Sequence, residues 1–502
     1  MGRISSAIEN FMEAQGYEAL TFGDVSLETG YADFMPDQGD LSSMLTRNIP
    51  MHVPFISAAM DTVTESRMAI AMASLGGIGV IHKNLSAAEQ ATEVSRVKRY
   101  LHGLISDPVV FSDDVSVEHL LEEKRQNNYT FAGFPIINKE GRLAGILTAR
   151  DTKFLSDYNM NVADVMTKDL IVGREGTTMK EAFELMVKNK VGKLPIVDDD
   201  YRLIGLYSFS DVRRIIENID PALNRDSHHQ LRVAAAIGPY DRERIEVLLQ
   251  EEVDCLVVDT AHGHSKGVVD TVAMLKNEYP QVDVVAGNVA SEEGAKAVID
   301  AGADAVKVGV GPGSICTTRV VAGVGVPQLT AVYRAAKGTE GTSVPVIADG
   351  GICYSGDVAK ALAVGADSVM MGSALAGTEE SPGERILHQG RTFVDYRGMG
   401  AVDAMKEGEG SRQRYGHHLV SDPSKFVPQG IEGLVPYRGQ VADVMRQFIG
   451  GLRFAFGYVG GATIEQYRQK ASFVRLSKAG VQESHPHDVK VMKDAPNYQV
   501  NT

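Results

Sequence analysis

The sequence predicts an α/β protein whose core is a closed (β/α)8 barrel, a TIM barrel, interrupted by an inserted domain. Eight short runs rich in Val, Ile and Ala end in small or polar residues, and a segment with helical spacing follows each run. This alternation is typical of a parallel sheet covered by helices. A long insertion between the second and third runs indicates that the chain also contains a second domain.

The eight runs are predicted to be the strands of the barrel. Near-continuous apolar runs are expected where parallel strands are buried on both faces, and their polar ends then collect at one mouth. An open doubly wound sheet is the alternative, but no GxGxxG motif opens the first βα unit, and the glycines of the sixth run have a different spacing. The runs lie at 54–60, 77–83, 232–238, 255–261, 283–290, 305–311, 345–351 and 368–373. The ends expected at the mouth are Asp259, Asn288, the loop 311–318, Asp349 and Gly372.

Composition limits the classes of function that are open to the chain. Its 502 residues are 44% hydrophobic and 23% charged, which is enough apolar sequence for a large core. The net charge of −15 argues against a broad surface for nucleic acid. The chain has neither the apolar region of a signal peptide nor an apolar window of about 18 residues, so no membrane contact is expected. With only three cysteines, we expect a cytoplasmic protein.

The insertion contains an internal repeat. We expect residues 1–94 to form the first part of the barrel, 95–220 the inserted domain and 221–502 the second part. Pro135 and Pro195 stand 60 positions apart in similar contexts, as do Asp151 and Asp211. The pattern resembles a tandem pair of CBS modules, whose family role is to bind regulatory nucleotides such as ATP or GTP. The alternative is a spacer that only shapes the oligomer, because the repeat specifies a fold and not its ligand.

The glycine-rich segment 309–319, GVGPGSICTTR, is the first candidate for chemistry. Its glycines let the backbone turn tightly and approach a ligand, which leaves Cys316 at the mouth of the barrel. A thiolate in this position is activated by backbone amides or positive charge and attacks an electron-poor carbon. A loop cysteine is more often inert, but the glycines and threonines around Cys316 favour catalysis.

GSICTTR and the following GVGVPQLTAV (323–332) resemble the active-site loop of the IMP dehydrogenases. The resemblance covers essentially the whole chain and includes SAAMDTVTE (57–65), GGIGVIHKN (76–84), DTAHGHS (259–265), AGNVA (286–290), ADGGI (348–352), YRGMG (396–400) and QESHPHD (482–488). It implies an NAD-dependent oxidoreductase that converts IMP to XMP, the committed step of guanine nucleotide synthesis. In that family a thiolate attacks C2 of the purine, hydride passes to NAD+, and water hydrolyses the covalent thioimidate. Cys316 matches the nucleophile, and Thr318 matches the residue that positions the water.

The substrate site is expected at the loops after the seventh and eighth strands, where such barrels commonly bind phosphate. Glycine amides and the Ser314 hydroxyl would donate to the phosphate, and the acceptor Asp349 would suit ribose hydroxyls. Gln429 stands where many relatives have Glu, and because Gln cannot take a proton, any proton relay there is doubtful. The full expected set is Ser314, Asp349, Gly351, Gly372, Ser373, Tyr396, Gly398, Met399, Gly400 and Gln429.

The resemblance also implies sites for the dinucleotide and for K+. Asp259 would bind a ribose of NAD+, although an Asp at a strand end can equally cap the next helix. Expected partners are Thr260, where many relatives have Ser, Asn288, Gly309 and Gly311. K+ would bind carbonyls of the cysteine loop and of a neighbouring subunit's C-terminal segment, which implies a homotetramer and leaves an octamer open. The matching positions are Gly311, Gly313, Cys316, Glu483, Ser484 and His485.

The polar segment 396–438 is expected to be a mobile flap. Its Arg414 and Tyr415 resemble the family's pair that enters the cofactor site after hydride transfer and activates water. Arginine is a poor base on pKa grounds, so this role follows from the resemblance alone, and solvated surface charges are the alternative. Two other functions stay open: an NADPH-dependent GMP reductase, which lacks the pair, and an inactive nucleotide sensor. The pair favours the dehydrogenase.

Overall fold

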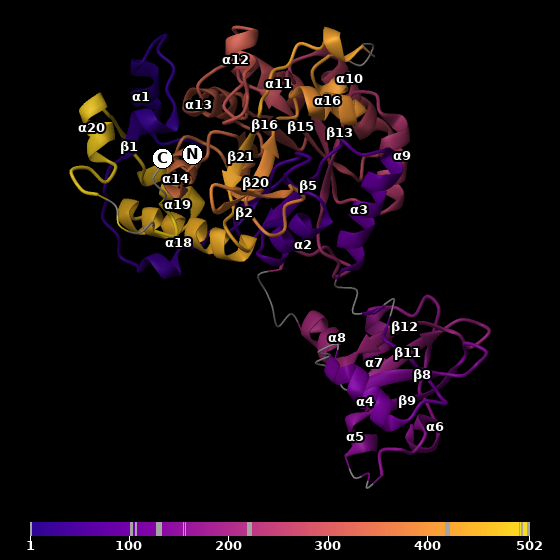
Figure 1. Cartoon of the computed structure of the whole chain (residues 1–502). Coiled ribbons are helices and arrows are strands. Elements are labelled where there is room, and N and C mark those ends of the chain that lie inside the picture. The colour runs from indigo at the N-terminus through magenta and orange to yellow at the C-terminus, as the bar shows by residue number, and fades with distance from the viewer. Residues whose placement is uncertain are drawn as a thin grey trace. The chain divides into compact units, whose positions relative to one another are not determined.

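The computed structural model describes residues 3–100, 104–105, 108–126, 133–153, 155, 157–217, 223–416, 422–490, 492 and 495–498. The chain divides into two compact units (Figure 1). The first unit is Met1–Lys98, Ala222–Asp226 and Leu231–Thr502, and the second is Arg99–Pro221 with Ser227–Gln230. Among the described residues, no helix has both the length and the apolar character that a membrane span requires.

Eight parallel strands close into a barrel in the first unit, so the predicted barrel is confirmed and the open sheet is wrong. Each predicted run contains one strand. The strands are shorter than the runs because the polar and glycine residues at their ends belong to the loops at the mouth. In order around the barrel they are β13 (Ala234–Ile237), β14 (Cys255–Asp259), β15 (Asp283–Val289), β16 (Ala305–Val308), β17 (Val346–Asp349), β18 (Ser368–Met371), β4 (Phe55–Ser57) and β5 (Ile78–Ile81).

Helices cover the outside of the barrel. α11 shows why they form: Ser291 caps it by accepting from the Gly294 amide, and Ala295 and Val298 are its buried apolar residues. Small residues allow close packing, since a Cβ at Gly338 would lie 2.7 Å from the Glu292 carbonyl oxygen. The barrel helices include α2 (Ser66–Ser74), α3 (Ala87–Arg99), α9 (Arg242–Gln250), α10 (Lys266–Glu278), α11 (Glu292–Asp300), α13 (Gln328–Gly338), α14 (Ser355–Ala363) and α18 (Val441–Val459).

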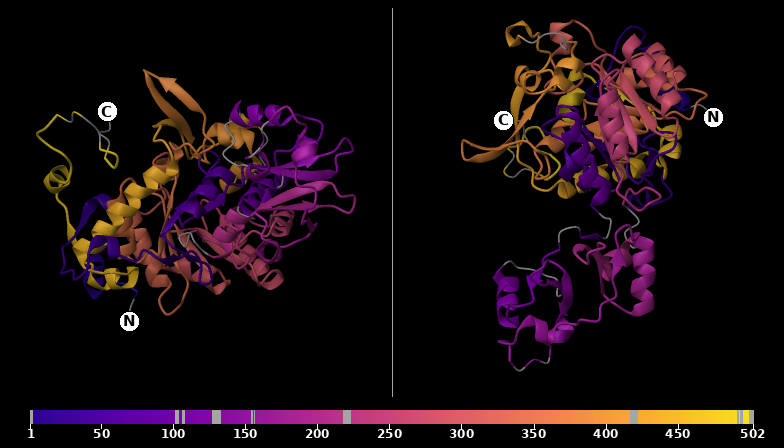
Figure 2. Two further views of the ribbon diagram at one scale, coloured as in Figure 1. Left: turned by 90° about the horizontal axis from the view of Figure 1, so that it is seen from below. Right: turned by 90° about the vertical axis from the view of Figure 1, so that its right-hand side faces the viewer.

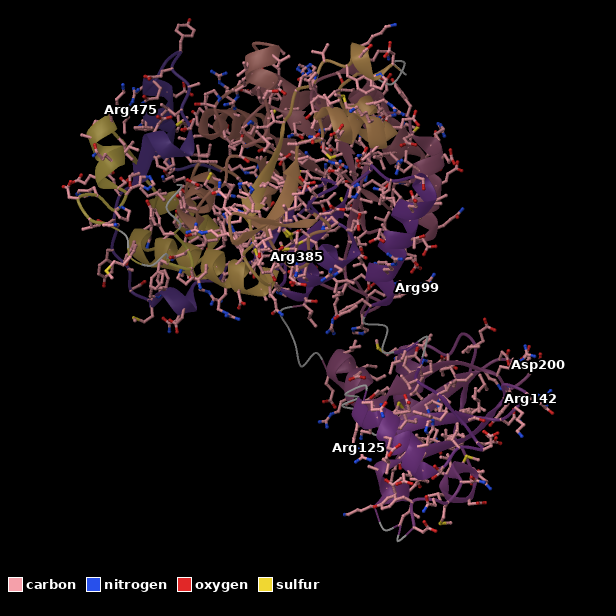
Figure 3. All side chains as sticks on the ribbon, viewed as in Figure 1. Arg99, Arg125, Arg142, Asp200, Arg385 and Arg475 are labelled. Carbon is pink, nitrogen blue, oxygen red and sulfur yellow. The ribbon has the colours of Figure 1, made fainter. Side chains whose placement is uncertain are left out.

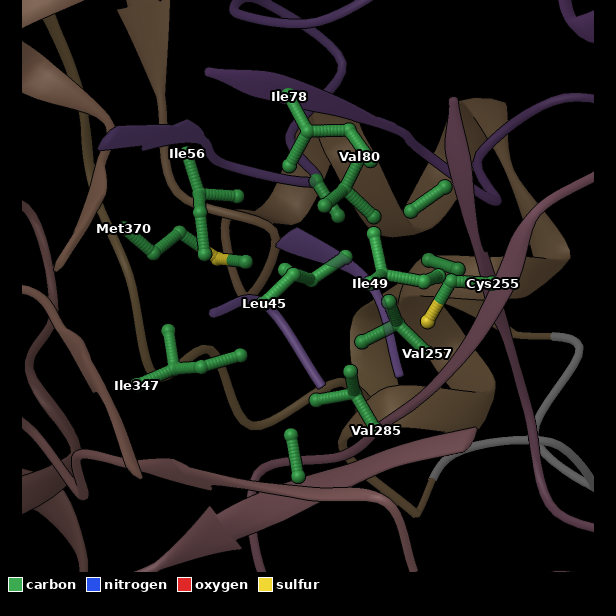
Figure 4. Close-up of a cluster of buried hydrophobic side chains, with 14 of the residues drawn as sticks. Leu45, Ile49, Ile56, Ile78, Val80, Cys255, Val257, Val285, Ile347 and Met370 are labelled. Atoms are coloured by element: carbon green, nitrogen blue, oxygen red, sulfur yellow. The ribbon is translucent and has the colours of Figure 1, made fainter. Parts of the chain in front are cut away.

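The interior of the barrel is a packed apolar core. Leu45 and Ile49 reach into it from the turn between β2 (Ser43–Met44) and β3 (Pro50–Met51), as Figure 4 shows. Inward-facing residues of the strands surround them, among them Ile56, Val80, Val257, Val285, Ile347 and Met370. Burying each such side chain contributes about 1.5–3 kcal/mol, so the strands form a rigid base for the residues at their carboxyl ends.

The second unit repeats one arrangement of strands and helices, each copy with its own apolar core. The hairpins β8–β9 and β11–β12 pair Pro135 with Ile146 and Pro195 with Leu206, and the register shifts at corresponding positions. Their turns meet where Leu143 donates to the Tyr201 carbonyl at 3.0 Å, near the residues Arg142 and Asp200 labelled in Figure 3. The elements include β6 (Leu104–Ile105), β7 (Phe111–Ser112), β8 (Gly133–Ile137), β9 (Leu143–Thr148), β10 (Gly173–Arg174), β11 (Lys193–Val197), β12 (Leu203–Ser208), α4 (Val117–Gln126), α7 (Met179–Asn189) and α8 (Phe209–Ile216).

The segment after β18 carries the elements that approach the mouth of the barrel. β19 (Arg385–His388) and β20 (Arg391–Arg397) form a hairpin that projects from the first unit (Figure 2), and β21 (Glu432–Pro436) pairs with β20. Two short helices, α16 (Val402–Glu407) and α17 (Glu409–Arg414), follow β20. The predicted flap therefore begins in β20 and ends just after β21, and its residues 417–421 lie outside the described part of the chain.

Candidate active site

A cavity of about 130 Å³ opens at the carboxyl ends of the barrel strands. Most of the residues expected at the site line it. Small-molecule sites usually measure roughly 300 Å³ or more, so this cavity is small, and Arg414 and Tyr415 form part of its wall. The expected residues that line it are Asn288, Gly309, Gly311, Gly313, Ser314, Cys316, Thr318, Asp349, Gly351, Gly372, Ser373, Tyr396, Gly398, Met399, Arg414, Tyr415 and Gln429.

Cys316 is the one cysteine of the chain on this cavity. Its Sγ lies 3.1 Å from Oγ1 of Thr318, at the start of α12 (Thr318–Val321). A backbone hydrogen bond holds the cysteine loop against the segment before β21. In it, the Thr317 amide donates to the Gln429 carbonyl oxygen at 3.0 Å. By contrast, Cys255 is enclosed in β14, where burial raises the pKa of its thiol well above the usual range.

Glycine is required where the cysteine loop leaves β16. Gly309 has a φ of 151°, and a Cβ there would lie 2.2 Å from the Asp349 carbonyl oxygen. Gly311 has a φ of 80°, and its Cβ would meet the Arg319 side chain at 2.6 Å. Both glycines therefore allow the tight turn that the sequence predicted, and the approach of this backbone to a ligand stays a prediction.

Four neighbouring strands each contribute one polar side chain to a buried cluster beside the cavity. Lys307 of β16 donates to Asp259 Oδ1 at 2.8 Å, to Asp349 Oδ2 at 2.7 Å and to Asn288 Oδ1. Asn288 of β15 donates in turn to Asp349 Oδ2 at 2.9 Å. The sequence placed Asp259, Asn288 and Asp349 together at the mouth but missed Lys307. The missed signal was a single charged residue inside the apolar run AVKVGVG.

Lys83, just after β5, is a second buried cation that sequence reasoning missed. Its Nζ donates to the carbonyl oxygen of Asp259 at 2.8 Å and to that of Ile237 at 3.3 Å. Burial first, and then the nearby charge of Arg414, lowers the pKa of Lys83 well below its ordinary value. Three basic side chains, Lys83, Lys307 and Arg414, thus contact Asp259 at the end of β14.

Helix α17 lies closed against the mouth of the barrel. Nη1 of Arg414 forms an ion pair with Asp259 Oδ2, and only 15% of the arginine side chain is exposed. A Cβ at Gly410 would lie 2.2 Å from the Lys83 carbonyl oxygen, so glycine permits this close contact. Burial raises the pKa of Tyr415, which packs against Gly400. Arg414 is therefore not a solvated surface charge.

The part of the cavity where the sequence predicted the substrate is lined by Tyr396 of β20 and by the loop after β18. A Cβ at Gly372 would lie 2.9 Å from the Tyr396 hydroxyl oxygen. Burial raises the pKa of Tyr396, and its hydroxyl donates to Sδ of Met60 at 3.8 Å. The Tyr396 hydroxyl is protonated at neutral pH and is therefore a hydrogen-bond donor. It lies near Ser314 and near Gly372, which follows β18.

Some expected site residues lie behind or away from the cavity. Thr260 donates its hydroxyl to the Gly287 carbonyl at 2.9 Å and so uses it within the protein. Asp259 does not cap the next helix, because α10 begins after Ser265. Gly400 contacts Tyr415. Glu483, Ser484 and His485 lie exposed at the end of α20 (Lys478–Glu483), outside the lining of the cavity.

Comparison with known proteins gives consistent matches along the chain. The family described as "IMP dehydrogenase / GMP reductase domain" matches residues 19–487. An inosine-5'-monophosphate dehydrogenase of Aquifex aeolicus is 50% identical over 489 residues, 96% of this chain and 98% of that protein. One of Bacillus subtilis is 48% identical over 492 residues, with 96% and 98% covered. A solved GMP reductase of Trypanosoma brucei, in complex with guanosine 5'-monophosphate, is 36% identical with a TM-score of 0.78, covering 95% of this chain and 99% of its own.

Proposed function

The chain belongs to the IMP dehydrogenase / GMP reductase family and has IMP dehydrogenase activity, and we propose that it performs this reaction through a covalent intermediate on Cys316. The activity is an NAD-dependent oxidation in the biosynthesis of GMP. The observation that carries the proposed chemistry is the position of Cys316, on the cavity and beside the Thr318 hydroxyl. The test is NADH formation from IMP and NAD+ by the purified chain, which the loss of the Cys316 thiol should abolish.

Cys316 divides the reaction into two steps. Its thiolate attacks C2 of the purine and forms a sulfur–carbon bond, and the hydrogen on C2 then departs as hydride. NAD+, when bound, accepts that hydride. Water held by Thr318 next attacks C2, the sulfur–carbon bond breaks, and XMP leaves while the thiol is restored. Separating oxidation from hydrolysis in this way is the usual benefit of covalent catalysis.

We assign the substrate to the lining formed by the strand ends and by the segment 396–400. Asp349 would accept from ribose hydroxyls, and Ser314 and Tyr396 would donate to the phosphate beside Gly372. Gly351 and Ser373 would complete the phosphate site. The base would lie between Cys316 and the residues Gly398, Met399, Gly400 and Gln429.

The residues next to Arg414 fit a dinucleotide. Asp259 Oδ2 already accepts from an N–H donor of α17, and a ribose hydroxyl is the same kind of partner. Asn288, Gly309 and Gly311 lie on the same part of the lining. We therefore assign these residues and Asp259 to NAD+, and we infer that the closed α17 takes the place of the dinucleotide after hydride transfer.

GMP reduction is the second candidate, because two similar solved structures are of a GMP reductase. The closed Arg414 and Tyr415 favour hydrolysis, since the reductase reaction releases ammonia and needs no attacking water. The higher identity to the dehydrogenases points in the same direction. We also propose a cytoplasmic location, which the three free thiols support.

We propose that the second unit is a tandem CBS pair that binds a purine nucleotide. The repeated hairpins and their separate cores support this assignment. Calorimetric titration of the full chain with ATP and GTP, in excess IMP to fill the barrel, is expected to give saturable binding, with CTP as control. Heat that is equal for all three nucleotides, or no heat, would leave the spacer as the better description.

A K+ site and a homotetramer are proposed together. Carbonyl oxygens of Gly311, Gly313 and Cys316 would bind the ion with those of Glu483, Ser484 and His485 from a neighbouring subunit.

Replacing KCl with LiCl at constant ionic strength is expected to lower the steady-state rate severalfold. Because backbone carbonyls would bind the ion, Ser484→Ala should retain the response to K+. A rate that is the same in both salts, or a response lost in Ser484→Ala, contradicts a carbonyl site. The measurement is the initial rate of NADH formation.

A further inference from the structure

We propose that Lys307 is a positioning residue that orients the carboxylates of the substrate and dinucleotide sites at the same time. The inference rests on the proposed function, since it takes Asp349 as the substrate's ribose partner and Asp259 as that of the dinucleotide. It adds a physical link between the two sites through one buried ammonium group.

The ammonium group of Lys307 meets acceptors on both neighbouring strands and one strand farther. The acceptors on the two neighbouring strands are Asp349 of β17 and Asn288 of β15, and the acceptor one strand farther is Asp259 of β14. The three acceptors match the three N–H donors of an ammonium group. Lys307 therefore has no hydrogen left for a ligand and acts on the ligands only through these partners.

Each aspartate gives Lys307 one oxygen and keeps the other for a different partner. Asp259 bonds to Lys307 through Oδ1, which turns Oδ2 toward Arg414 of α17. Asp349 bonds to Lys307 and to Asn288 through Oδ2 and lines the cavity, so Oδ1 is the oxygen that would accept from a ligand hydroxyl. The ammonium group thus fixes the rotation of both carboxylates.

The packing around Lys307 holds its stem in place. A Cβ at Gly287 would lie 2.7 Å from the Lys307 Cβ, so the backbone of β15 lies close beside the lysine and leaves no room for another side chain. Only 1% of the lysine is exposed, and Val306 and Val308 beside it are fully buried. A lysine inside an apolar strand destabilises the fold unless its charge is paired, so its presence here points to the carboxylates that it holds.

The other two cations near Asp259 do not duplicate this arrangement. Lys83 contacts the backbone carbonyl oxygen of Asp259, and Arg414 contacts its Oδ2. Arg414 also belongs to α17, which occupies the proposed dinucleotide position. Lys307 is the cation that bonds to both Asp259 and Asp349.

The test compares Lys307→Met, which keeps the length of the side chain and removes the charge, with Lys307→Arg, which keeps the charge. We expect Lys307→Met to raise KM for IMP and KM for NAD+ together, each by about tenfold or more, as the loss of a hydrogen bond to a charged group does. Lys307→Arg should recover part of both affinities. IMP binding is measured separately as protection of the Cys316 peptide from alkylation, followed by mass spectrometry.

A purely structural role predicts a different result: a lower kcat, because less enzyme is folded, with both KM values unchanged. That result would overturn the proposal, as would a change in one KM only. If Lys307→Met does not fold, a double variant that carries both Asp259→Asn and Lys307→Met removes one negative and one positive charge together. It is compared with the single variant Asp259→Asn. The loss of Lys307 in the double variant should still raise KM for IMP. Equal KM values would overturn it. If the wild-type chain oxidises IMP, the proposed function stands, and an unexpected result with these variants then contradicts only the role of Lys307.

Discussion

Cys316→Ala is expected to abolish NADH formation from IMP and NAD+, with a loss on the order of 10⁴-fold or more. The reason is that alanine cannot form the sulfur–carbon bond, and the remaining residues of the cavity bind the substrate without activating its C2. The absorbance of NADH in a steady-state assay of the purified chain measures this directly. Affinity for IMP should be largely kept, because the phosphate and ribose contacts do not involve the thiol.

Cys353→Ala is the matched control, since this thiol lies on a loop outside the cavity. It should keep the wild-type rate. Activity retained in Cys316→Ala would remove the cysteine from the mechanism. Consumption of NADPH with GMP by the wild-type chain, without NADH formation from IMP, would instead identify a reductase.

Arg414→Ala is expected to give one rapid burst of NADH, equal to the number of sites, followed by a steady state lowered roughly 10²–10⁴-fold. Hydride transfer does not require Arg414 in the proposed mechanism, but hydrolysis does. The covalent adduct should therefore accumulate on Cys316, where intact-protein mass spectrometry after acid quench detects it. Stopped-flow absorbance resolves the burst.

Arg412→Ala serves as the control for Arg414, because both residues lie on α17 and Arg412 does not line the cavity. It should turn over at close to the wild-type rate. An unchanged steady state in Arg414→Ala would assign water activation to another group. Loss of the burst itself would instead place Arg414 in the oxidation step.

The strands of the barrel could be predicted because each is a short apolar run followed by a segment with helical spacing. The sequence could not show the residue at which each strand ends, since Gly238 and Gly311, for example, extend the predicted runs into loops. The repeat in the second unit was visible for a related reason: Pro135 and Pro195 occupy equivalent positions in two hairpins. Both predictions were possible because the periodicity of apolar residues and the repetition of a motif can be read from neighbouring residues alone.

The candidate site was predictable where its residues follow strands or glycine turns, as Cys316 and Asp349 do. Lys307 and Lys83 were missed because a lysine within an apolar run carries no sign of what it faces. The closed position of Arg414 was also out of reach, because its partner Asp259 is distant in sequence. Which donors meet which acceptors depends on packing between elements, which no local pattern encodes. The catalytic and binding roles stay predictions.

The ion pair between Arg414 and Asp259 has a consequence for inhibitor affinity. A molecule that binds at Asp259 competes with an internal ligand tethered to the same chain. Its apparent affinity is its intrinsic affinity multiplied by the fraction of chains in which α17 is open. Two compounds that make equal contacts with the cavity then differ in potency if one can bind while α17 is closed and the other cannot. Compounds that fill the substrate side and leave Asp259 to Arg414 avoid this competition.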